Sequence, residues 1–321
     1  MAEIPRAQIV TLTINPALDV STSVRKMVPF TKMRCTQAHR DPGGGGINVA
    51  RVLKRLGIDA TAIYPAGGAT GNLLATLLER ESVPSIVIPA SNDTREDITI
   101  FDETTREQFR LVFPGAPLSD IEAQQCLAAI ARITPPPAFV IASGSLPAGV
   151  PHDFYGKVAQ TSDAHSKIIV DTSGPFLKAA LEAGVYLIKP NLREFQELAG
   201  ITSSDEATLV EAARRLFDRY HIEVIALSMG RDGALLMTRD GALRANGLPV
   251  EAISVSGAGD SFLGAMLWSL VNGNSLEVAL RYAVAGGTAA LLSPGTELCR
   301  AEDVYRLASE VIVMPIDRKS R

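Results

Sequence analysis

The sequence predicts an α/β protein in which helices cover both faces of a mainly parallel sheet. Two observations predict this class. Short β-branched segments alternate along the chain with amphipathic segments of helical length, which is the pattern of strands joined through helices. Two apolar helical segments, 261–271 and 276–292, then follow, and the Ala and Gly content of the second indicates that it is buried.

The elements are expected in the order of this alternation. The helix at 47–56 shows the helical period well, because Val49, Ala50, Leu53 and Leu56 fall on one face. The other elements before the two apolar helices are strands at 9–14, 61–64, 138–142, 167–170, 185–188, 224–228 and 235–238, and helices at 73–81 and 154–161.

Two polar segments, about 19–39 and 92–113, break the alternation. Apolar residues recur in them at every second position, which predicts hairpins. The clearest of these residues are Ile98, Ile100, Phe109, Leu111 and Phe113. We expect the two segments to form a small antiparallel β lid, inserted into one domain that spans residues 1–321. A layer of this kind closes over a site or pairs with another subunit.

Composition and charge exclude several classes of function. Of the 321 residues 46% are hydrophobic, and 31 Lys and Arg stand against 35 Asp and Glu, for a net charge of −4. This balance argues against a basic surface for nucleic acid or membranes. Cys35, Cys126 and Cys299 are scattered, which predicts free thiols in a reducing compartment. No secretory pattern and no apolar run of membrane-spanning length is visible, so the expected location is the cytoplasm.

Four consecutive glycines, 43–46, precede the first predicted helix. They allow the backbone to approach a ligand without side chains in the way, or they form a flexible turn. The run is neither a Walker loop nor a dinucleotide fingerprint. Asn48, one turn into the helix, either hydrogen-bonds a sugar hydroxyl or caps the helix start.

A second glycine motif, Gly-Ala-Gly-Asp at 257–260, precedes an apolar helix. Small residues at a helix start leave N–H groups free to meet developing negative charge, as phosphoryl transfer requires. Asp260 is suited to accept the proton of an attacking hydroxyl. The alternative is an Asp that only stabilises the helix N-terminus through its dipole. The motif alone favours neither interpretation.

Two further segments lie at predicted strand ends. Asn191 and Glu194 have the spacing of a capping box, which for Asn191 alone is the stronger interpretation. In the functional interpretation, Lys189 and Asn191 contact nucleotide phosphates and Glu194 holds a hydrated Mg²⁺. The segment 228–233 suits either a nucleotide-contacting loop or a hairpin turn.

Asp19 and three basic residues are candidates for a sugar-phosphate site. Asp19 follows the first predicted strand, and ligands of open α/β sheets bind at the carboxyl ends of strands. It is suited to accept two sugar hydroxyls, although Asp after Pro is also common in turns. Lys32, Arg34 and Arg95 lie in the lid segments. Such residues usually face solvent, whereas on a layer covering a sugar they would explain a phosphate-bearing substrate.

Four motifs occur in an order that resembles the PfkB, or ribokinase-like, family of carbohydrate kinases. They are Gly-Gly-Gly-Gly-Ile-Asn-Val-Ala at 43–50, Ser-Gly-Ser-Leu-Pro at 143–147, Lys-Pro-Asn with Glu at 189–194, and Gly-Ala-Gly-Asp at 257–260. The resemblance extends over essentially the whole chain. It implies a three-layer α/β/α sandwich, with a small β-sheet lid through which two subunits often form a homodimer.

The resemblance also implies roles for individual residues. Asp260 is the base, and the backbone of Gly257, Ala258 and Gly259 with it forms the anion hole. The sugar phosphate is held by Asp19, Gly44, Asn48, Arg95 and Ser145, with Lys32 and Arg34 nearby on the lid. ATP is contacted by Lys189, Asn191, Ser228, Gly230 and Gly233, with Glu194 supporting Mg²⁺. A K⁺ site that many members carry aligns with Ser254, Ser256, Ala290, Ser293 and Gly295.

The segment that aligns with the K⁺ site departs from the family pattern. The family has Asp-Thr-x or Ser-Thr-x where this chain has Ser-Val-Ser at 254–256, and Val255 lacks the hydroxyl of Thr. Ser293 replaces an Asn, and Glu297 replaces a basic residue. K⁺ dependence therefore stays open, whereas the motif around Asp260 is intact.

The closest resemblance is to members that phosphorylate fructose 6-phosphate, mainly in segments 41–51, 63–71 and 295–299. Members that act on fructose 1-phosphate or tagatose 6-phosphate usually carry a Lys where this chain has Gly45. The expected reaction is transfer of the ATP γ-phosphate to the 1-hydroxyl of fructose 6-phosphate, giving fructose 1,6-bisphosphate. The alternatives are those two other acceptors, or a non-catalytic regulator that binds sugar phosphates.

Overall fold

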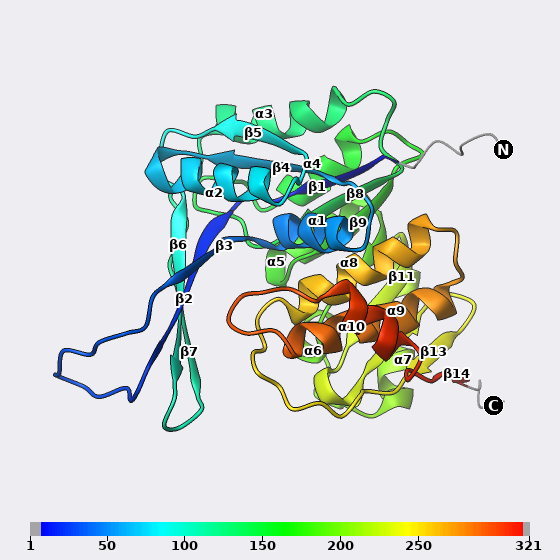
Figure 1. Cartoon of the computed structure of the whole chain (residues 1–321). Coiled ribbons are helices and arrows are strands. Elements are labelled where there is room, and N and C mark those ends of the chain that lie inside the picture. The colour runs from blue at the N-terminus through cyan, green and yellow to red at the C-terminus, as the bar shows by residue number, and fades with distance from the viewer. Residues whose placement is uncertain (1–7, 317–321) are drawn as a thin grey trace, which may run out of the picture.

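The computed structural model describes residues 8–316, and a ten-stranded sheet runs through its centre (Figure 1). The strand order is β14-β13-β12-β11-β10-β9-β8-β1-β4-β5. Its strands are β1 (Ile9–Leu12), β4 (Thr61–Ala66), β5 (Ser85–Pro89), β8 (Phe139–Ser143), β9 (Lys167–Asp171), β10 (Val185–Ile188), β11 (Ile222–Ser228), β12 (Ala234–Met237), β13 (Ala242–Ala245) and β14 (Val313–Ile316).

The helices divide between the two faces of this sheet. They are α1 (Gly45–Arg55), α2 (Gly68–Arg80), α3 (Asp120–Ala131), α4 (Phe154–Thr161), α5 (Gly174–Ala183), α6 (Leu192–Ala199), α7 (Glu206–Arg219), α8 (Ala258–Val271), α9 (Leu276–Leu291) and α10 (Ala301–Ala308). One core contains apolar residues of α1, α2, α8, α9 and α10, and the other contains those of α3 to α7. Successive strand residues such as Ile9 and Val10 enter opposite cores. The predicted three-layer sandwich is confirmed.

Most of the sheet is parallel, as predicted, and one edge is not. The seven neighbouring strands β11, β10, β9, β8, β1, β4 and β5 pair in parallel. Strands β12, β13 and β14 extend the sheet at one edge with antiparallel pairing. Because their carboxyl ends meet at one edge, the parallel strands place the loops that follow them side by side. Among the described residues no helix is long and apolar enough to cross a membrane.

The lid is a separate four-stranded sheet of order β3-β2-β6-β7, formed by β2 (Ala17–Val24), β3 (His39–Gly43), β6 (Arg95–Asp102) and β7 (Gln108–Val112). It projects from one end of the sandwich, together with the long connection between β2 and β3 (Figure 1). The expectation of a purely antiparallel lid was wrong, because β2 and β6 pair in parallel over eight residue pairs. Each predicted hairpin is present, but the two are joined through a crossover that contains α1 and α2.

Several helix starts differ from the prediction. Helix α2 begins at Gly68 rather than residue 73, since the segment Gly-Ala-Thr-Gly has low helix propensity and becomes helical only in its tertiary setting. Helix α8 begins at Ala258 rather than residue 261, so Asp260 lies inside its first turn. The position of Asp260 is therefore fixed by the helical backbone.

Substitution of Gly46 tests how closely α1 packs on the sheet. A Cβ at Gly46 would lie 2.7 Å from the carbonyl oxygen of Leu12, a backbone atom that cannot rotate away. We expect Gly46→Ala to lower the free energy of unfolding by about 1–3 kcal/mol, measured by urea denaturation. The control is Gly241→Ala, because a Cβ there meets nothing within 4 Å. Equal unfolding midpoints for the two variants would contradict the close packing.

Candidate active site

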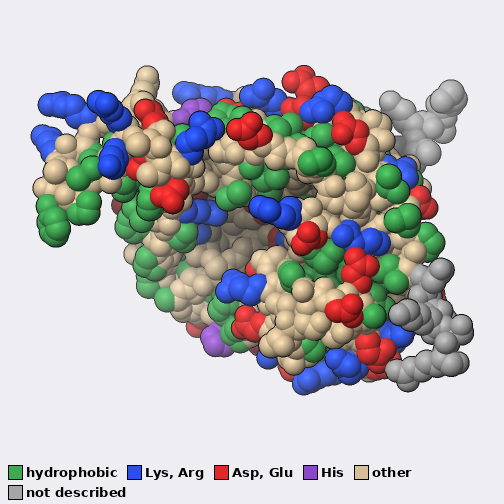
Figure 2. Space-filling view, turned by 90° about the horizontal axis from the view of Figure 1, so that it is seen from below, with side chains coloured by type: hydrophobic (Ala, Val, Ile, Leu, Met, Phe, Trp, Pro, Cys, Tyr) green, Lys and Arg blue, Asp and Glu red, His purple; other side chains and the backbone are tan. Residues whose placement is uncertain are grey.

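The carboxyl ends of the parallel strands, the N-termini of α1 and α8, and the inner face of the lid converge on one region. Seen from below, the surface between the lid and the rest of the molecule is hollowed, and Lys and Arg side chains lie around the hollow (Figure 2). The predicted residues Asp19, Asn48, Lys189 and Asp260 interact with one another in this region, directly or through their charges. The sequence motifs therefore assemble into one site.

Asp260 lies in the first turn of α8 as a half-buried residue. Gly257 caps this helix with φ 72°, a left-handed conformation that favours glycine. The Asn48 side chain on α1 donates a hydrogen bond to Asp260 Oδ2 at 2.8 Å. Burial, reinforced by the charge of Asp171, raises the pKa of Asp260 to about 6, and the Asn48 hydrogen bond and the charge of Lys189 oppose this rise. A carboxylate with this pKa is ionised at neutral pH and is a competent proton acceptor.

Lys189, which is buried, and Asp171, which is half-buried, form an ion pair beside Asp260. The Nζ atom of Lys189, at the end of β10, lies 3.2 Å from Asp171 Oδ1 at the end of β9. Burial alone would lower the pKa of Lys189, but Asp171 and Asp260 outweigh it and raise that pKa, so the ammonium group stays charged. A Cβ at Gly259 would lie 3.4 Å from Nζ, which places the positive charge next to the start of α8. Asp171 was not predicted from the sequence, although it ends a strand, and a position at a strand end is the signal that also identified Asp19.

The first turn of α8 is suited to hold an anion. A helix start leaves its first N–H groups without acceptors inside the helix, and no side chain caps α8. These groups belong to Ala258, Gly259 and Asp260, and the first helical hydrogen bond runs from Ser261 N to Gly257 O at 2.8 Å. Together with Lys189, they form a positive cradle around the Asp260 carboxylate.

The glycine run brings α1 into direct contact with the sheet. Gly44 caps the helix with φ 115°, and Ile47 N donates to Thr13 Oγ1 at 2.8 Å. A side chain at Gly45 would collide with Ser143 Oγ. This contact sets the position of Asn48, one turn later.

The inner face of the lid carries three carboxylates side by side. Asp19 on β2 is in register with Asp41 on β3 and with Asp97 on β6, and all three are buried. Asp41 and Asp97 have hydrogen-bond donors or cationic partners, whereas no hydrogen bond joins Asp19 to the described residues. Burial raises the pKa of Asp19 to about 7, and the charge of Arg110 on β7 lowers it. Arg110, exposed on the lid, was not identified from the sequence.

The predicted phosphate-binding residues lie in two places. Arg95 donates to Asp97 Oδ1, Phe113 O and Asn15 O, at distances of 3.1, 2.9 and 3.3 Å. Asn15 in turn donates to Ser145 Oγ at 3.0 Å, so Arg95 and Ser145 share a neighbour. Lys32 and Arg34, by contrast, are exposed on the connection between β2 and β3, which projects with the lid (Figure 1).

The predicted nucleotide-binding residues meet at the ends of β10 and β11. Asn191 and Glu194 form a capping box on α6, in which each side chain accepts from the other residue's N–H at 2.9 Å. Asn191 also forms a β-bridge with Ser228. A short 3-10 turn, Gly230–Asp232, follows, and a Cβ on Gly230 would meet open space. Asn191 therefore caps α6, as one of the two interpretations predicted. The space beside Gly230 is open to a ligand.

The residues that align with a K⁺ site also come together. Ser254 Oγ donates to Gly295 O at 2.6 Å and accepts from Ser256 N at 3.2 Å, while Ser293 Oγ donates to Leu298 O at 3.2 Å. Ala290 and these serines are buried. Hydroxyl and carbonyl oxygens of this kind suit a hard cation. Among residues 8–316, no cluster of three or more His, Cys, Asp or Glu side chains offers a site for a transition metal.

Comparison with known proteins relates this site to one family. A family model described as pfkB family carbohydrate kinase matches residues 14–303. The ATP-dependent 6-phosphofructokinase isozyme 2 of Mycobacterium tuberculosis strain H37Rv is 44% identical over 94% of this chain and 89% of its own. The D-tagatose-1-phosphate kinase of Bacillus licheniformis is 34% identical over 89% of this chain and 93% of its own. The crystal structure of Escherichia coli phosphofructokinase-2 with potassium superposes with a TM-score of 0.90, at 38% identity over 95% of this chain and 99% of its own.

Substitution of Asp19 tests the desolvation of the lid carboxylate. Because its folded pKa of about 7 exceeds the ordinary value of 3.8, the native state holds a proton that the unfolded state releases, and stability is lost as pH rises through about 7. We expect Asp19→Asn to remove this loss. Its urea midpoint should therefore exceed that of the wild type by more at pH 8 than at pH 5. A difference that does not change with pH would show that Asp19 is already solvated or paired.

Proposed function

Since the chain belongs to the pfkB family of carbohydrate kinases and is an ATP-dependent sugar kinase, we propose that it phosphorylates the 1-hydroxyl of fructose 6-phosphate to give fructose 1,6-bisphosphate. The observation that carries the catalytic part is the Asp260 carboxylate, held by Asn48 within the positive first turn of α8. The identity of the acceptor is supported by the relatives that are named for it and by Gly45.

Asp260 accepts the proton of the acceptor hydroxyl as that oxygen attacks the γ-phosphorus of ATP. The charge that develops on the transferred phosphoryl group is met by the N–H groups of Gly257 to Asp260 and by the Lys189 ammonium. Mg²⁺ bound to the phosphates would neutralise further charge. Glu194 fits a role toward that ion, because only its Oε2 is engaged by Asn191 N and its other carboxylate oxygen makes no hydrogen bond to a described residue.

On the sugar side, Asp19 and the Gly44–Asn48 turn form the acceptor site. A buried carboxylate without a hydrogen-bond donor is suited to bind sugar hydroxyls, each of which would replace lost hydration. Arg95 and Ser145, which both contact Asn15, would meet the sugar phosphate. A Lys at position 45, usual in relatives that take fructose 1-phosphate or tagatose 6-phosphate, is incompatible with the present Ser143 rotamer. Gly45 therefore sets this chain apart from those relatives, which supports fructose 6-phosphate as the acceptor.

ATP would lie along the ends of β10 and β11, contacting Lys189, Asn191, Ser228, Gly230 and Gly233. Beside the anion hole, the oxygens of Ser254, Ser256, Ala290, Ser293 and Gly295 would take K⁺. The structural relative contains potassium, which supports this assignment, and Val255 in place of a hydroxylated residue weakens it.

The lid is suited to join two copies of the chain. Its outer face carries Val20, Ile98, Ile100, Phe109 and Leu111, and register pairs Ile98 with Leu111 and Ile100 with Phe109. Phe109 and Leu111 are 38% and 49% exposed, which is unusual for an ordered apolar row. In such a homodimer, the projecting Lys32 and Arg34 would reach toward the site of the partner subunit.

The acceptor is tested by coupled ADP-release assays with fructose 6-phosphate, tagatose 6-phosphate, fructose 1-phosphate and ribose. We expect fructose 6-phosphate to give the highest kcat/KM and Asp260→Asn to lower kcat by about 10²–10⁴-fold, as loss of the base predicts. Preference for another phosphosugar would replace the acceptor, and turnover of ribose alone would overturn the phosphosugar site. Equal slow rates for wild type and Asp260→Asn would favour a regulator that only binds sugar phosphates. Repeating the screen with and without K⁺ tests the cation site.

The dimer is tested by placing a charge on the outer face of the lid. We expect Leu111→Lys to convert a dimer into monomers in sedimentation velocity, because a buried unpaired ammonium group is costly at an interface. The control is Ile121→Lys, since Ile121 is 72% exposed on α3, away from the lid. If both variants sediment like the wild type, the outer face of the lid is not the interface.

A further inference from the structure

Arg51 on α1 is a buried guanidinium that no sequence motif identified. It is 1% exposed, and it is the largest fully buried side chain among the described residues. Its Nε and Nη2 atoms donate to the two carboxylate oxygens of Glu81 at 2.8 and 2.6 Å, and Nη2 also lies 3.4 Å from Asp41 Oδ1. Nη1 donates to Pro42 O at 2.8 Å and to Asn48 Oδ1 at 3.4 Å. Arg51 therefore joins α2, the lid strand β3 and the active-site amide.

The contact with Asn48 determines which end of that amide faces Asp260. A guanidinium only donates hydrogen bonds, so only the amide oxygen can face Arg51. An ionised carboxylate only accepts them, so only the amide nitrogen can face Asp260. Arg51 and Asn48 are three residues apart on one helix and share a face, which keeps the three groups in line. With Arg51 in place, the amide has one favourable orientation.

We propose that Arg51 is a positioning residue for phosphoryl transfer, which orients the Asn48 amide against the Asp260 carboxylate and ties this pair to the lid through Asp41 and Pro42. The proposal rests on Asp260 being the base, as proposed above. It goes further, because it makes the alignment of the base depend on strand β3. A shift of β3 moves two acceptors of the guanidinium, and the Asn48 contact moves with them.

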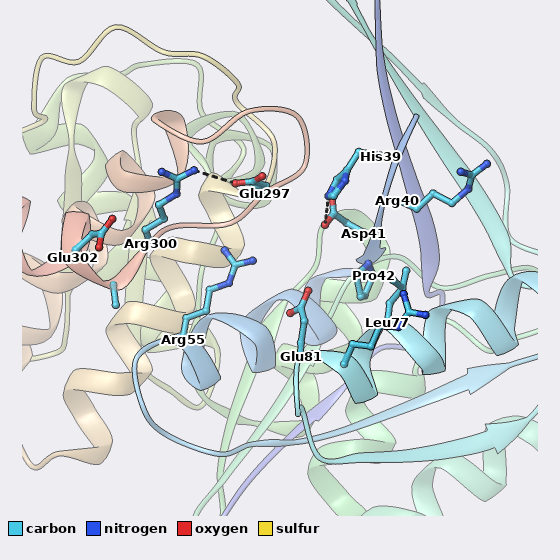
Figure 3. Close-up of a pocket in the computed structure, with 12 residues that line it drawn as sticks. His39, Arg40, Asp41, Pro42, Arg55, Leu77, Glu81, Glu297, Arg300 and Glu302 are labelled. Carbon is cyan, nitrogen blue, oxygen red and sulfur yellow. Dashed lines mark hydrogen bonds and ion pairs between the residues drawn. The ribbon is translucent and has the colours of Figure 1, made fainter. Parts of the chain in front are cut away.

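The outer partners of Arg51, which are Asp41, Pro42 and Glu81, line a pocket of about 630 Å³ (Figure 3). Asp41 and Glu81 lie on one wall, and Arg55, Glu297 and Arg300 lie across from them. Asp41 is fixed there by Thr296 Oγ1 at 2.7 Å and by His39 Nε2 at 3.3 Å. The line Glu81–Arg51–Asn48–Asp260 thus runs from this pocket to the catalytic centre.

The pH dependence of kcat reports on this alignment. The charged groups that face Asp260 are Asp171 on β9 and Asp19 on the lid, which oppose its ionisation, and Lys189 on β10 and Arg110 on β7, which favour it. The Asn48 hydrogen bond also lowers the pKa of Asp260. When the amide is misoriented, that pKa rises, and the acid limb of the kcat profile moves to higher pH.

The test compares Arg51→Lys with Arg55→Lys, on whichever acceptor the wild type phosphorylates. Arg55 is a matched control, since it lies one turn later on α1 and donates to Leu298 O and Cys299 O, outside the line to Asp260. We expect Arg51→Lys to lower kcat by about 10–100-fold and to move the acid limb of the kcat profile to higher pH. The KM for ATP should change little. Arg55→Lys should lower the urea midpoint and leave the acid limb of the kcat profile at the wild-type pH.

A second variant keeps the test decisive if Arg51→Lys does not fold. Arg51→Met with Glu81→Gln removes the cation and its main counter-charge together, so no uncompensated Glu81 carboxylate remains. It should show the same loss of kcat and the same shift of the acid limb. Wild-type kcat and an unshifted limb in a folded variant of either kind would overturn the proposal. Failure of the proposed acceptor is distinguishable, because it appears already in the wild type.

Discussion

Close contact between α1 and α8 is the constraint on which the catalytic site depends. A Cβ at Gly264 of α8 would lie 2.5 Å from Val52 Cγ1 of α1, so the two helices are nearer than ordinary side chains permit. At this separation the Asn48 amide reaches Asp260 at 2.8 Å. The glycines at 45 and 46 bring the start of α1 onto the sheet by the same means. Glycines at these contacts thus allow the close packing that sets the distance between the N-termini of α1 and α8.

Crowded carboxylates give the site its electrostatic character. Burial raises the pKa of three carboxyl groups, those of Asp19, Asp171 and Asp260. The charge of a neighbouring side chain also changes the pKa of each. Lys189 and the start of α8 offset this repulsion at the point where phosphate charge would arrive. The result is a carboxylate, Asp260, with a pKa of about 6, low enough to be ionised near neutrality and high enough to suit the proposed role of base.

The sequence predicted those parts of the fold and site that local patterns encode. The alternation of strands and helices, the two lid hairpins and the capping box of Asn191 and Glu194 all reflect neighbours in the chain. The parallel pairing of β2 and β6 was not predictable, because residues more than seventy positions apart form it. For a related reason, the sequence did not identify Arg51, Arg110 and Asp171. Each lies in an ordinary helix, strand or strand end, and acquires its partner only in the folded chain.

The groups that favour the ionised form of Asp260, one hydrogen-bond donor and two cations, come from different elements. Lys189 belongs to the sheet, Asn48 belongs to α1, and Arg110 belongs to the exposed lid strand β7. Lys189 is held by Asp171 at the ends of central strands, whereas Arg110 is exposed on the lid. Asn48 stands between the two, because Arg51 ties its amide to Asp41 and Pro42 of β3. The lid therefore contributes to the ionisation of Asp260 in two ways, through the charge of Arg110 and through the orientation of the Asn48 amide. A sugar held between Asp19 and Asp260 would stabilise the arrangement in which both effects favour proton transfer.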